Sequence, residues 1–425
     1  MQVFPPDAKL AIHGGTPAKQ RPDPPMFPGG MAVDEAEEAA VLEVLRNKQL
    51  FRYYSPNNTP SKVSELEASF AAKKGTKYAQ AVTSGTAALI CGLQGIGVGP
   101  GDEVIVPAYT WIASATAVLA VGAVPIVAEV DETLLLDPVD FEAKITPYTK
   151  AVIVVHMRGA PAPMDKILPI AQKHGLKVVE DCAQANGATY QGQEVGTFGD
   201  AGAYSLQFNK IITCGEGGMV VTNDPVIWER AAMFHDAGAI SGRHNIEELM
   251  WGINFRMPEV LGAIALVQLQ KLDGLLAAMR ARKQMLKAGI ADMMEHKGLS
   301  FRKITDPEGD ASICTILLMH DAKEAQAVVQ ALRAENIGAG TLYERDKRDL
   351  HVYAHWTPVI NQKSWGGNAG PWTWAQREIE YDHDMCPRSL ELLGRAVHLN
   401  VSPLLTNEDV EEMIDGVNRV LNVLT

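Results

Sequence analysis

The sequence has few cysteines and no motif that pairs them. Its 425 residues include five cysteines, which are odd in number, scattered and never spaced as CxxC: Cys91, Cys182, Cys214, Cys314 and Cys386. This pattern argues against a disulfide framework and against a zinc site. We therefore expect reduced thiols, a cytoplasmic location and no bound metal.

The sequence also has fewer basic than acidic residues, no long apolar run and no signal-peptide pattern in its first residues. The 38 lysines and arginines do not balance the 51 acidic residues, so the net charge is −13. This charge argues against nucleic acid as a partner. No uninterrupted apolar run reaches about 18 residues, so no membrane span is expected. The first residues lack the basic start and apolar core of a signal peptide.

The composition is that of a large globular protein. Apolar residues make up 47% and charged residues 21% of a chain long enough for more than one domain. Residues 1–30 are rich in proline and glycine and predict an extended arm. Residues 34–49 have helical spacing and an acidic start, which favours a helix.

Short β-rich runs then alternate with helical stretches from about residue 60 to 225. The runs are nearly continuous in apolar residues, and segments such as 85–97 and 164–175 are typical of crossover helices. This alternation predicts an α/β fold with a mainly parallel, seven-stranded sheet covered on both faces. The expected strands are 78–83, 103–108, 124–130, 150–157, 176–181, 201–206 and 218–223.

A second, smaller α/β domain is predicted after a long connecting helix at 258–294. Strand 313–319, helix 322–336 and a strand near 338–343 indicate this domain. Residues 351–385, rich in Trp, His and Gly, predict an irregular excursion. The domain boundaries are therefore placed at 1–30 for the arm, 31–257 for the large domain and 258–425 for the helix and small domain.

The first candidate for chemistry is "AVTSGTAAL", residues 81–89. A strand ends near Val82, a Ser-Gly-Thr turn follows and a helix begins. Free backbone N–H groups and the positive end of that helix would meet there, which suits a phosphate. Gly85 would let the backbone approach closely. An ordinary N-cap without a ligand is the alternative.

Asp181 and Lys210 are the other candidates. Asp181 ends the strand "LKVVED", at the edge where parallel sheets place ligands. A carboxylate there needs either a structural salt bridge or a ligand cation such as a protonated heterocyclic nitrogen. Lys210 lies in a polar break between two strands, with Ser205 five residues before it. A lysine in an apolar pocket can form a Schiff base, although most lysines lie solvated on the surface.

Together these features fit pyridoxal 5'-phosphate. That cofactor needs a phosphate cup, a lysine for its aldehyde and an acid for its pyridine nitrogen. Protonation of the nitrogen makes the ring an electron sink, which would explain the carboxylate at the strand end. The sequence therefore predicts a pyridoxal phosphate enzyme.

Several motifs resemble the DegT/DnrJ/EryC1/StrS aminotransferases. They are "SGTAAL", "PAYTWIASATAV", "VVEDCAQANGA", "SLQFNKIITCGEGGMVVTND" and "GINFRMPEVLGAIALVQL", in the order that the family has. The resemblance runs from about residue 31 to 425. It implies a fold-type-I enzyme that moves an amino group from glutamate or glutamine to a keto sugar or cyclitol ketone by a ping-pong mechanism.

The resemblance also implies roles for individual residues. Lys210 would hold the cofactor and transfer the proton, and Asp181 would pair with the pyridine nitrogen. Active sites shared across a homodimer are implied as well. Gln184 would contact the ring hydroxyl, and Trp111 would stack on the ring. The phosphate would be bound by Gly85, Thr86 and Ser205, and Asn254 would reach the phosphate of the neighbouring subunit.

The substrate stays open. Arg158 stands where many relatives carry an aromatic or small residue, so it is a candidate for an anionic group on a substrate, with an ion pair within the dimer as the alternative. Arg256 competes for the donor, which leaves the acceptor to Arg158, and His156 is a further substrate candidate. Residues 301–310, followed by the Trp- and His-rich segment, weakly resemble a branch that aminates keto-octulosonate sugars. Residues 10–17, "LAIHGGTP", resemble the leaders of some aminocyclitol and sugar branches.

The sequence argues against two other functions. Dehydratases of this family have histidine at the lysine position, so Lys210 argues against a pyridoxal-dependent sugar dehydratase. A non-catalytic regulator that keeps the fold would not need an intact set of lysine, aspartate and phosphate residues. The aminotransferase is therefore the preferred interpretation.

Overall fold

The computed structural model describes residues 9–54, 60–238, 249–367 and 370–425. All seven strands expected in the large sheet are present. They are β1 (Tyr78–Val82), β2 (Glu103–Pro107), β3 (Val124–Ala128), β4 (Thr149–Val155), β5 (Lys177–Asp181), β8 (Ala201–Ser205) and β9 (Gly218–Thr222).

The large sheet is mixed but mostly parallel. Its strand order is β1-β9-β8-β5-β4-β2-β3. Strand β9 runs antiparallel to both β1 and β8, and the pairs from β8 to β3 are parallel. Every residue of β2, β3, β8 and β9 is buried. Because neighbouring side chains point to opposite faces, this burial means that both faces are covered.

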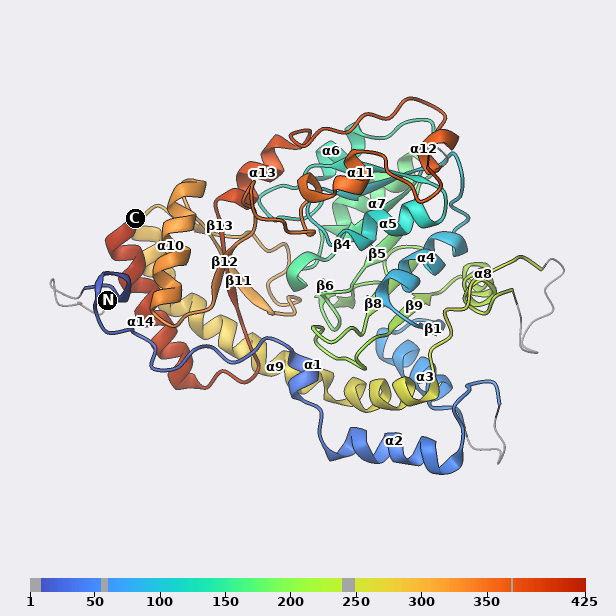
Figure 1. The fold of residues 1–425 in the computed structure, drawn as a ribbon, viewed down its shortest axis with the longest axis horizontal. Coiled ribbons are helices and arrows are strands. Elements are labelled where there is room, and N and C mark those ends of the chain that lie inside the picture. The colour runs from blue at the N-terminus through green and yellow to red at the C-terminus, as the bar shows by residue number, and fades with distance from the viewer. Residues whose placement is uncertain (1–8, 55–59, 239–248, 368–369) are drawn as a thin grey trace.

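Helices from the first 235 residues accompany this sheet, and most of them pack on it (Figure 1). The helix that follows β1 is apolar along most of its length and packs against β1, β5, β8 and β9. These helices are α1 (Pro28–Met31), α2 (Glu35–Asn47), α3 (Lys62–Lys74), α4 (Gly85–Gly95), α5 (Ala113–Ala120), α6 (Pro138–Ala143), α7 (Met164–Lys173) and α8 (Pro225–His235). A small hairpin, β6 (Thr189–Tyr190) and β7 (Gln193–Glu194), follows β5.

The C-terminal part builds a second, antiparallel sheet. Its order is β10-β11-β13-β12, formed by β10 (Ser300–Phe301), β11 (Cys314–Leu318), β12 (Ala339–Thr341) and β13 (Ala396–Asn400). Strands β11 and β12 were expected from the sequence, whereas β10 and β13 were not. Helices α10 (Ala322–Ala334) and α14 (Asn407–Leu424) pack together beside it and share a separate apolar core.

Helix α9 (Glu259–His296) connects the two parts and runs between α2 and the rest of the large domain (Figure 1). By length and composition alone it could cross a membrane. It packs instead against α2, α3 and α14, and its buried residues join both apolar cores. A helix at the centre of a globular protein has the same apolar composition.

The Trp- and His-rich excursion packs on the larger core. Tyr353, Trp356 and Cys386 are buried there, beside the strands of the large sheet. The excursion contains a 3-10 turn, Tyr353–His355, and two short helices, α11 (Thr357–Ile360) and α12 (Pro371–Trp374). It ends at α13 (Pro387–Gly394), which leads into β13. Residues after 258 therefore belong partly to the core of the large domain. The domain division between residues 257 and 258 stays a prediction.

The described part of the N-terminal arm, from Lys9, binds the small domain before it reaches the large one. Glu335 accepts hydrogen bonds from the backbone N–H groups of Ala11 and Ala18 at 2.8 and 2.6 Å. Lys19 is fully buried and lies 3.0 Å from Asp409. The arm is thereby fixed so that its residues 26–28 reach the cavity described next.

Candidate active site

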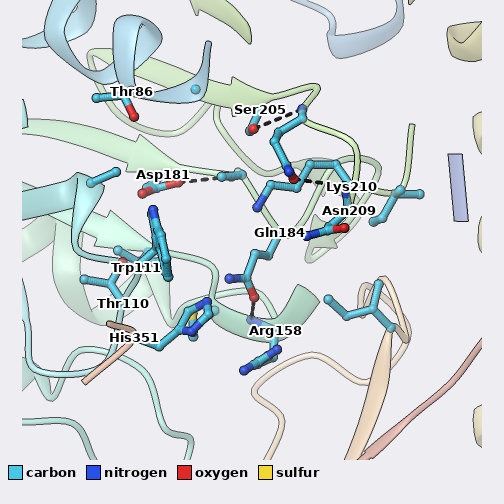
Figure 2. A pocket seen from close by; sticks show the side chains of 18 of the residues that line it. Thr86, Thr110, Trp111, Arg158, Asp181, Gln184, Ser205, Asn209, Lys210 and His351 are labelled. Atoms are coloured by element: carbon cyan, nitrogen blue, oxygen red, sulfur yellow. Dashed lines mark hydrogen bonds between the residues drawn. The ribbon is translucent and has the colours of Figure 1, made fainter. Parts of the chain in front are cut away.

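A cavity of about 760 Å³ opens at the carboxyl ends of β4 and β5. Parallel strands place their ligands at this edge, as the sequence predicted. Figure 2 shows residues that line it. Of the residues predicted for the site, the following face the cavity: Gly85, Thr86, Trp111, Arg158, Asp181, Gln184, Ser205 and Lys210.

One end of the cavity is the N-terminus of α4. The Ser84 side chain caps this helix by accepting a hydrogen bond from the backbone N–H of Ala87 at 3.0 Å. Gly85 lies so close to Ser205 that a Cβ on it would come within 2.7 Å of the Ser205 Cβ. Two hydroxyls, on Thr86 and Ser205, line the cavity beside the helix end. Free N–H groups, a helix dipole and hydroxyls at one point suit a phosphate.

Asp181 is buried and has no ion-pair partner within 4 Å among the residues that the structure describes. Its carboxylate accepts hydrogen bonds from the Ser114 hydroxyl at 2.8 Å and the Ala183 N–H at 3.0 Å. Burial raises the pKa of Asp181, and these two hydrogen bonds only partly oppose the rise. The structural salt bridge that the sequence left open is therefore absent here, and a cationic ligand would stabilise the charged form.

Lys210 lies across the cavity in the loop that follows β8 (Figure 2). Burial lowers the pKa of its amine, although the negative charge of Asp181 opposes this. A lowered pKa gives more neutral amine, which is the form that attacks an aldehyde. The loop is held by hydrogen bonds from the Lys210 N–H to the Gln207 carbonyl at 2.9 Å and from the Gly29 N–H to the Lys210 carbonyl at 3.3 Å.

Gln184 and Arg158 lie together on the floor of the cavity. The backbone N–H of Arg158 donates to the Gln184 side-chain carbonyl at 3.2 Å, which orients that amide. Arg158 adopts a left-handed backbone with φ of 57°, which is uncommon outside glycine and is typical of functional positions. Its guanidinium donates to the Tyr109 hydroxyl at 3.0 Å, and no carboxylate lies within 4 Å of it in the described part of the chain.

Trp111 lines the same cavity and remains 45% exposed. Its ring centroid lies 4.9 Å from that of His351, which comes from the excursion. An indole with one open face, in a cavity with Asp181 and Lys210, can stack on a flat cofactor ring.

Three predicted residues do not line this cavity. His156 is fully buried: its Nε2 lies 3.0 Å from Glu180 and its Nδ1 accepts from the Ala162 N–H at 2.9 Å. Arg256 pairs with Asp236 at 2.7 Å. Asn254 is exposed and accepts from the Arg256 N–H.

His156, Glu180 and Cys182 are close enough to one another to suggest a metal site. Both ring nitrogens of His156 are already used, however, and Glu180 also accepts three backbone N–H groups, each at 2.7 Å. Glu180 is therefore satisfied by the protein itself. The two neighbouring carboxylates at the end of β5 thus have different tasks: Glu180 stabilises the fold and Asp181 faces the cavity.

Sequence reasoning missed the residues that the small domain and the excursion contribute. His351, His398 and Asn400 line the cavity opposite the α4 terminus. His398 and Asn400 lie on β13, a strand that the sequence did not reveal. The histidine-rich composition of residues 351–385 was a signal for His351, but not one that gave its position.

The set of side chains fits pyridoxal 5'-phosphate. Gly85 leaves the space that a phosphate needs, Asp181 is a buried carboxylate without a cation partner in the described residues, and Lys210 is a half-buried amine facing the same cavity. Each of these features would be costly in a protein that bound nothing. Here they converge on one cavity.

Comparison with known proteins agrees with this geometry. The model of the DegT/DnrJ/EryC1/StrS aminotransferase family matches residues 32–364. An L-glutamine:2-deoxy-scyllo-inosose aminotransferase of Streptoalloteichus tenebrarius is 38% identical over 294 residues, 67% of this chain and 68% of the relative. A putative L-glutamine:3-amino-2,3-dideoxy-scyllo-inosose aminotransferase of Micromonospora echinospora is 32% identical and covers 97% of both chains.

Solved structures show the same fold. The crystal structure of 3-amino-5-hydroxybenzoic acid synthase has a TM-score of 0.79 at 27% identity and covers 95% of this chain and 100% of its own. The structure of S. venezuelae DesV has a TM-score of 0.77 at 29% identity, with 95% and 99% coverage.

Proposed function

Since the chain belongs to the DegT/DnrJ/EryC1/StrS aminotransferase family, pyridoxal phosphate enzymes of fold type I, we propose that it moves the amino group of glutamine to a polyhydroxylated cyclohexanone. Aminotransferase activity and the cofactor follow from the family. The donor and the acceptor are the proposal. They are supported by relatives that are 32 to 38% identical and use L-glutamine and inososes by their names.

When bound, the cofactor supplies an aldehyde that accepts the amino group and a ring that takes up electrons. The residues of the chain bind, orient and transfer protons around it. Lys210 Nζ would hold the aldehyde carbon and then move a proton as a partly neutral amine. Asp181, fixed by Ser114 and Ala183, would hold the proton on the ring nitrogen.

The phosphate and the ring hydroxyl would be held by residues that are already oriented. The end of α4 carries the backbone N–H groups, and Ser205 adds a hydroxyl. Gln184 would hydrogen-bond to the ring hydroxyl, because the hydrogen bond from the Arg158 N–H fixes the orientation of its side-chain amide. These contacts bring the cofactor to Lys210 in one orientation, and proximity of this kind accounts for much of catalysis.

Arg158 would bind the carboxylate of the amino donor. Its guanidinium faces the cavity without a carboxylate partner in the described residues, and a charge left so would be costly. The sequence favoured the acceptor, because Arg256 competed for the donor. Arg256 pairs with Asp236 outside the cavity, and cyclitol ketones carry no charge, so the donor is the better ligand for Arg158.

The observation that carries the proposal is that one cavity brings Lys210 and Asp181 together with the guanidinium of Arg158, which pairs with no carboxylate in the described residues. Holoenzyme should be mixed with glutamine labelled in its α-amino nitrogen and with 2-deoxy-scyllo-inosose, and the amino product examined by mass spectrometry. We expect the label in the product. A holoenzyme that transfers no label, or that transfers it only to keto-octulosonate acceptors, would contradict the proposal.

We also propose that the working unit is a homodimer. Helix α2 and its surroundings expose apolar side chains, and a groove of about 550 Å³ lies between α2 and the loop of Phe208, which is 46% exposed. Surfaces of this kind favour association. A partner would explain why Asn254 lies outside its own cavity. The other exposed apolar side chains here are Val33, Leu42, Leu45, Leu50 and Phe51. Sedimentation of an active monomer would refute this assembly.

A further inference from the structure

His351 stands out because the roles above leave it without a function. It belongs to the excursion, yet it lines the cavity and contacts Trp111 (Figure 2). The backbone fixes this position: the Thr110 N–H donates to the His351 carbonyl and the Ile112 N–H to the Leu350 carbonyl, each at 2.9 Å. The segment that carries His351 is thereby joined to the loop that carries Trp111.

Asp349 fixes the orientation and the tautomer of this ring. His351 Nδ1 lies 2.7 Å from Asp349 Oδ1, and the same oxygen accepts the His351 backbone N–H at 2.9 Å. Because an ionised carboxylate only accepts hydrogen bonds, Nδ1 must carry the hydrogen. In the neutral ring Nε2 is then an acceptor. Nε2 has no hydrogen-bond partner within the described residues.

The electrostatic surroundings keep the ring neutral. Burial lowers the pKa of His351, and the cations Arg158 and Lys210 lower it further, against the opposing effect of Asp349. A neutral ring with Nδ1 protonated can accept a hydrogen bond but cannot attract an anion. A hydroxyl group is the donor that complements it.

The rest of this wall has the same character. His398 also lines the cavity, and burial lowers its pKa well below the usual value. Asn400 contributes a neutral amide beside it. The polar side chains that line the cavity from the small domain and the excursion, His351, His398 and Asn400, are therefore uncharged, and Ile313 is an apolar neighbour on the same side. A ring that bears several hydroxyls matches such a wall better than a carboxylate does.

We propose that His351, held by Asp349, is a specificity-determining residue that accepts a hydrogen bond from a ring hydroxyl of the acceptor ketone. This inference rests on the proposed function, since it concerns the acceptor named there. It separates the two substrates by chemistry: Arg158 binds the charge of the donor, and His351 binds a hydroxyl of the acceptor.

The test compares His351→Phe, which keeps a ring against Trp111 but removes the acceptor nitrogen, with wild type. Amino-loaded enzyme is mixed in single turnovers with 2-deoxy-scyllo-inosose or with cyclohexanone, which has no hydroxyl. We expect His351→Phe to lower kcat/KM for the inosose about tenfold, which corresponds to the loss of one buried hydrogen bond. The kcat/KM for cyclohexanone should change by less than about twofold. His351→Gln should restore part of the loss.

Two controls separate this role from a structural one. His174, an exposed histidine paired with Glu142 outside the cavity, should tolerate His174→Phe without effect on either ketone. The glutamine step should be unchanged in His351→Phe, because it reports on Trp111 and the cofactor. Equal losses with the inosose and cyclohexanone, or a damaged glutamine step, would overturn the proposal.

Binding of scyllo-inositol, measured by calorimetry, provides a readout without turnover. Wild type should bind it several-fold more tightly than His351→Phe. If the wild-type enzyme does not aminate the inosose, the proposed function is wrong. The binding of scyllo-inositol would still test the role of His351 in that case. Equal or absent binding of scyllo-inositol by both proteins would overturn that role.

Discussion

The two walls of the cavity differ in how the chain builds them. The cofactor wall comes from short segments at the ends of β1, β5 and β8, with Gly85, Asp181 and Lys210 each inside one motif. The substrate wall combines Arg158 after β4 with His351 from the excursion and His398 on β13. The first wall is local in sequence, whereas the second depends on contacts between distant segments.

This difference separates chemistry from selectivity. The cofactor wall must meet the same phosphate, ring and aldehyde in every relative, so its motifs match the family. The substrate wall depends on single side chains from different segments, here Arg158 after β4 and His351 from the excursion. Substitutions in the cofactor wall should therefore slow both half-reactions, whereas those in the substrate wall should slow one.

The largest effect is expected for Lys210→Ala. The variant loses the amine that holds the aldehyde carbon and moves the proton, so turnover should fall by about 10³-fold or more. The fold should remain, because the side chain makes no hydrogen bond within the described residues. Steady-state transamination and circular dichroism check this. Lys173→Ala, in an exposed pair with Glu142, is the matched control, and near wild-type turnover of Lys210→Ala would disprove its role.

Asp181→Asn should come next. The amide keeps the size of the side chain but no longer stabilises a protonated ring nitrogen, and losing one partner of a buried pair costs about 3 kcal/mol or more. Both half-reactions should slow by roughly a hundredfold, and the cofactor should bind more weakly. Rapid mixing with glutamine and with the ketone measures the two steps. Rates equal to wild type in either step would contradict the assignment.

Arg158→Ala should affect one step. Loss of a hydrogen bond to a charged group costs about 1.5–3 kcal/mol, so the glutamine step should slow by roughly ten- to a hundredfold, with the ketone step nearly unchanged. Arg158→Lys should restore little, because an ammonium lacks the two-pronged geometry. Arg345→Ala, on the exposed surface, is the control. A loss confined to the ketone step would mean that Arg158 binds the acceptor and not the donor.

Gly85→Ala tests the phosphate cup without touching a charge. The added Cβ would lie 2.7 Å from the Ser205 Cβ, so the cup must shift, and overpacking of this kind costs about 1–3 kcal/mol. Cofactor affinity should fall about tenfold or more. Gly92→Ala, in the same helix, meets only ordinary contacts at 3.6 and 3.7 Å and is the control. Cofactor affinity is measured by fluorescence titration. If Gly85→Ala and Gly92→Ala bind the cofactor equally well, the turn at Gly85 does not form the phosphate site.

The smallest effect is expected outside both walls. Hydrogen bonds from Thr406 and Lys19 hold the pKa of Asp409 at about 2, against the opposing effect of burial. Because this folded-state pKa lies below the unfolded value of about 4, the pair stabilises the fold above about pH 4 and loses this effect as the pH falls toward 2. Asp409→Asn should therefore cost about 1 kcal/mol at neutral pH and little near pH 2. Denaturation at several pH values should show this difference shrinking, and a constant one would argue against the pair.

How much the sequence predicted follows the same division. The large sheet was predicted strand by strand, because its apolar runs are continuous and separated by helices. Lys210, Asp181 and Gly85 were found because each lies in a short motif with one chemical purpose. Strand β13 was missed, since "AVHLN" contains a histidine and an asparagine and is not a continuous apolar run, and His398 and Asn400 were missed with it. His351 could not be placed because only tertiary contacts bring the excursion to Trp111.

The division between donor and acceptor is tested most directly by measuring both half-reactions in Arg158→Ala and in His351→Phe. Each holoenzyme is mixed rapidly with glutamine, and its amino-loaded form with 2-deoxy-scyllo-inosose, while the cofactor absorbance is followed. The two variants should show opposite losses: the glutamine step in Arg158→Ala and the ketone step in His351→Phe. If both variants lose the same step, or both steps equally, the substrate wall is not divided in this way.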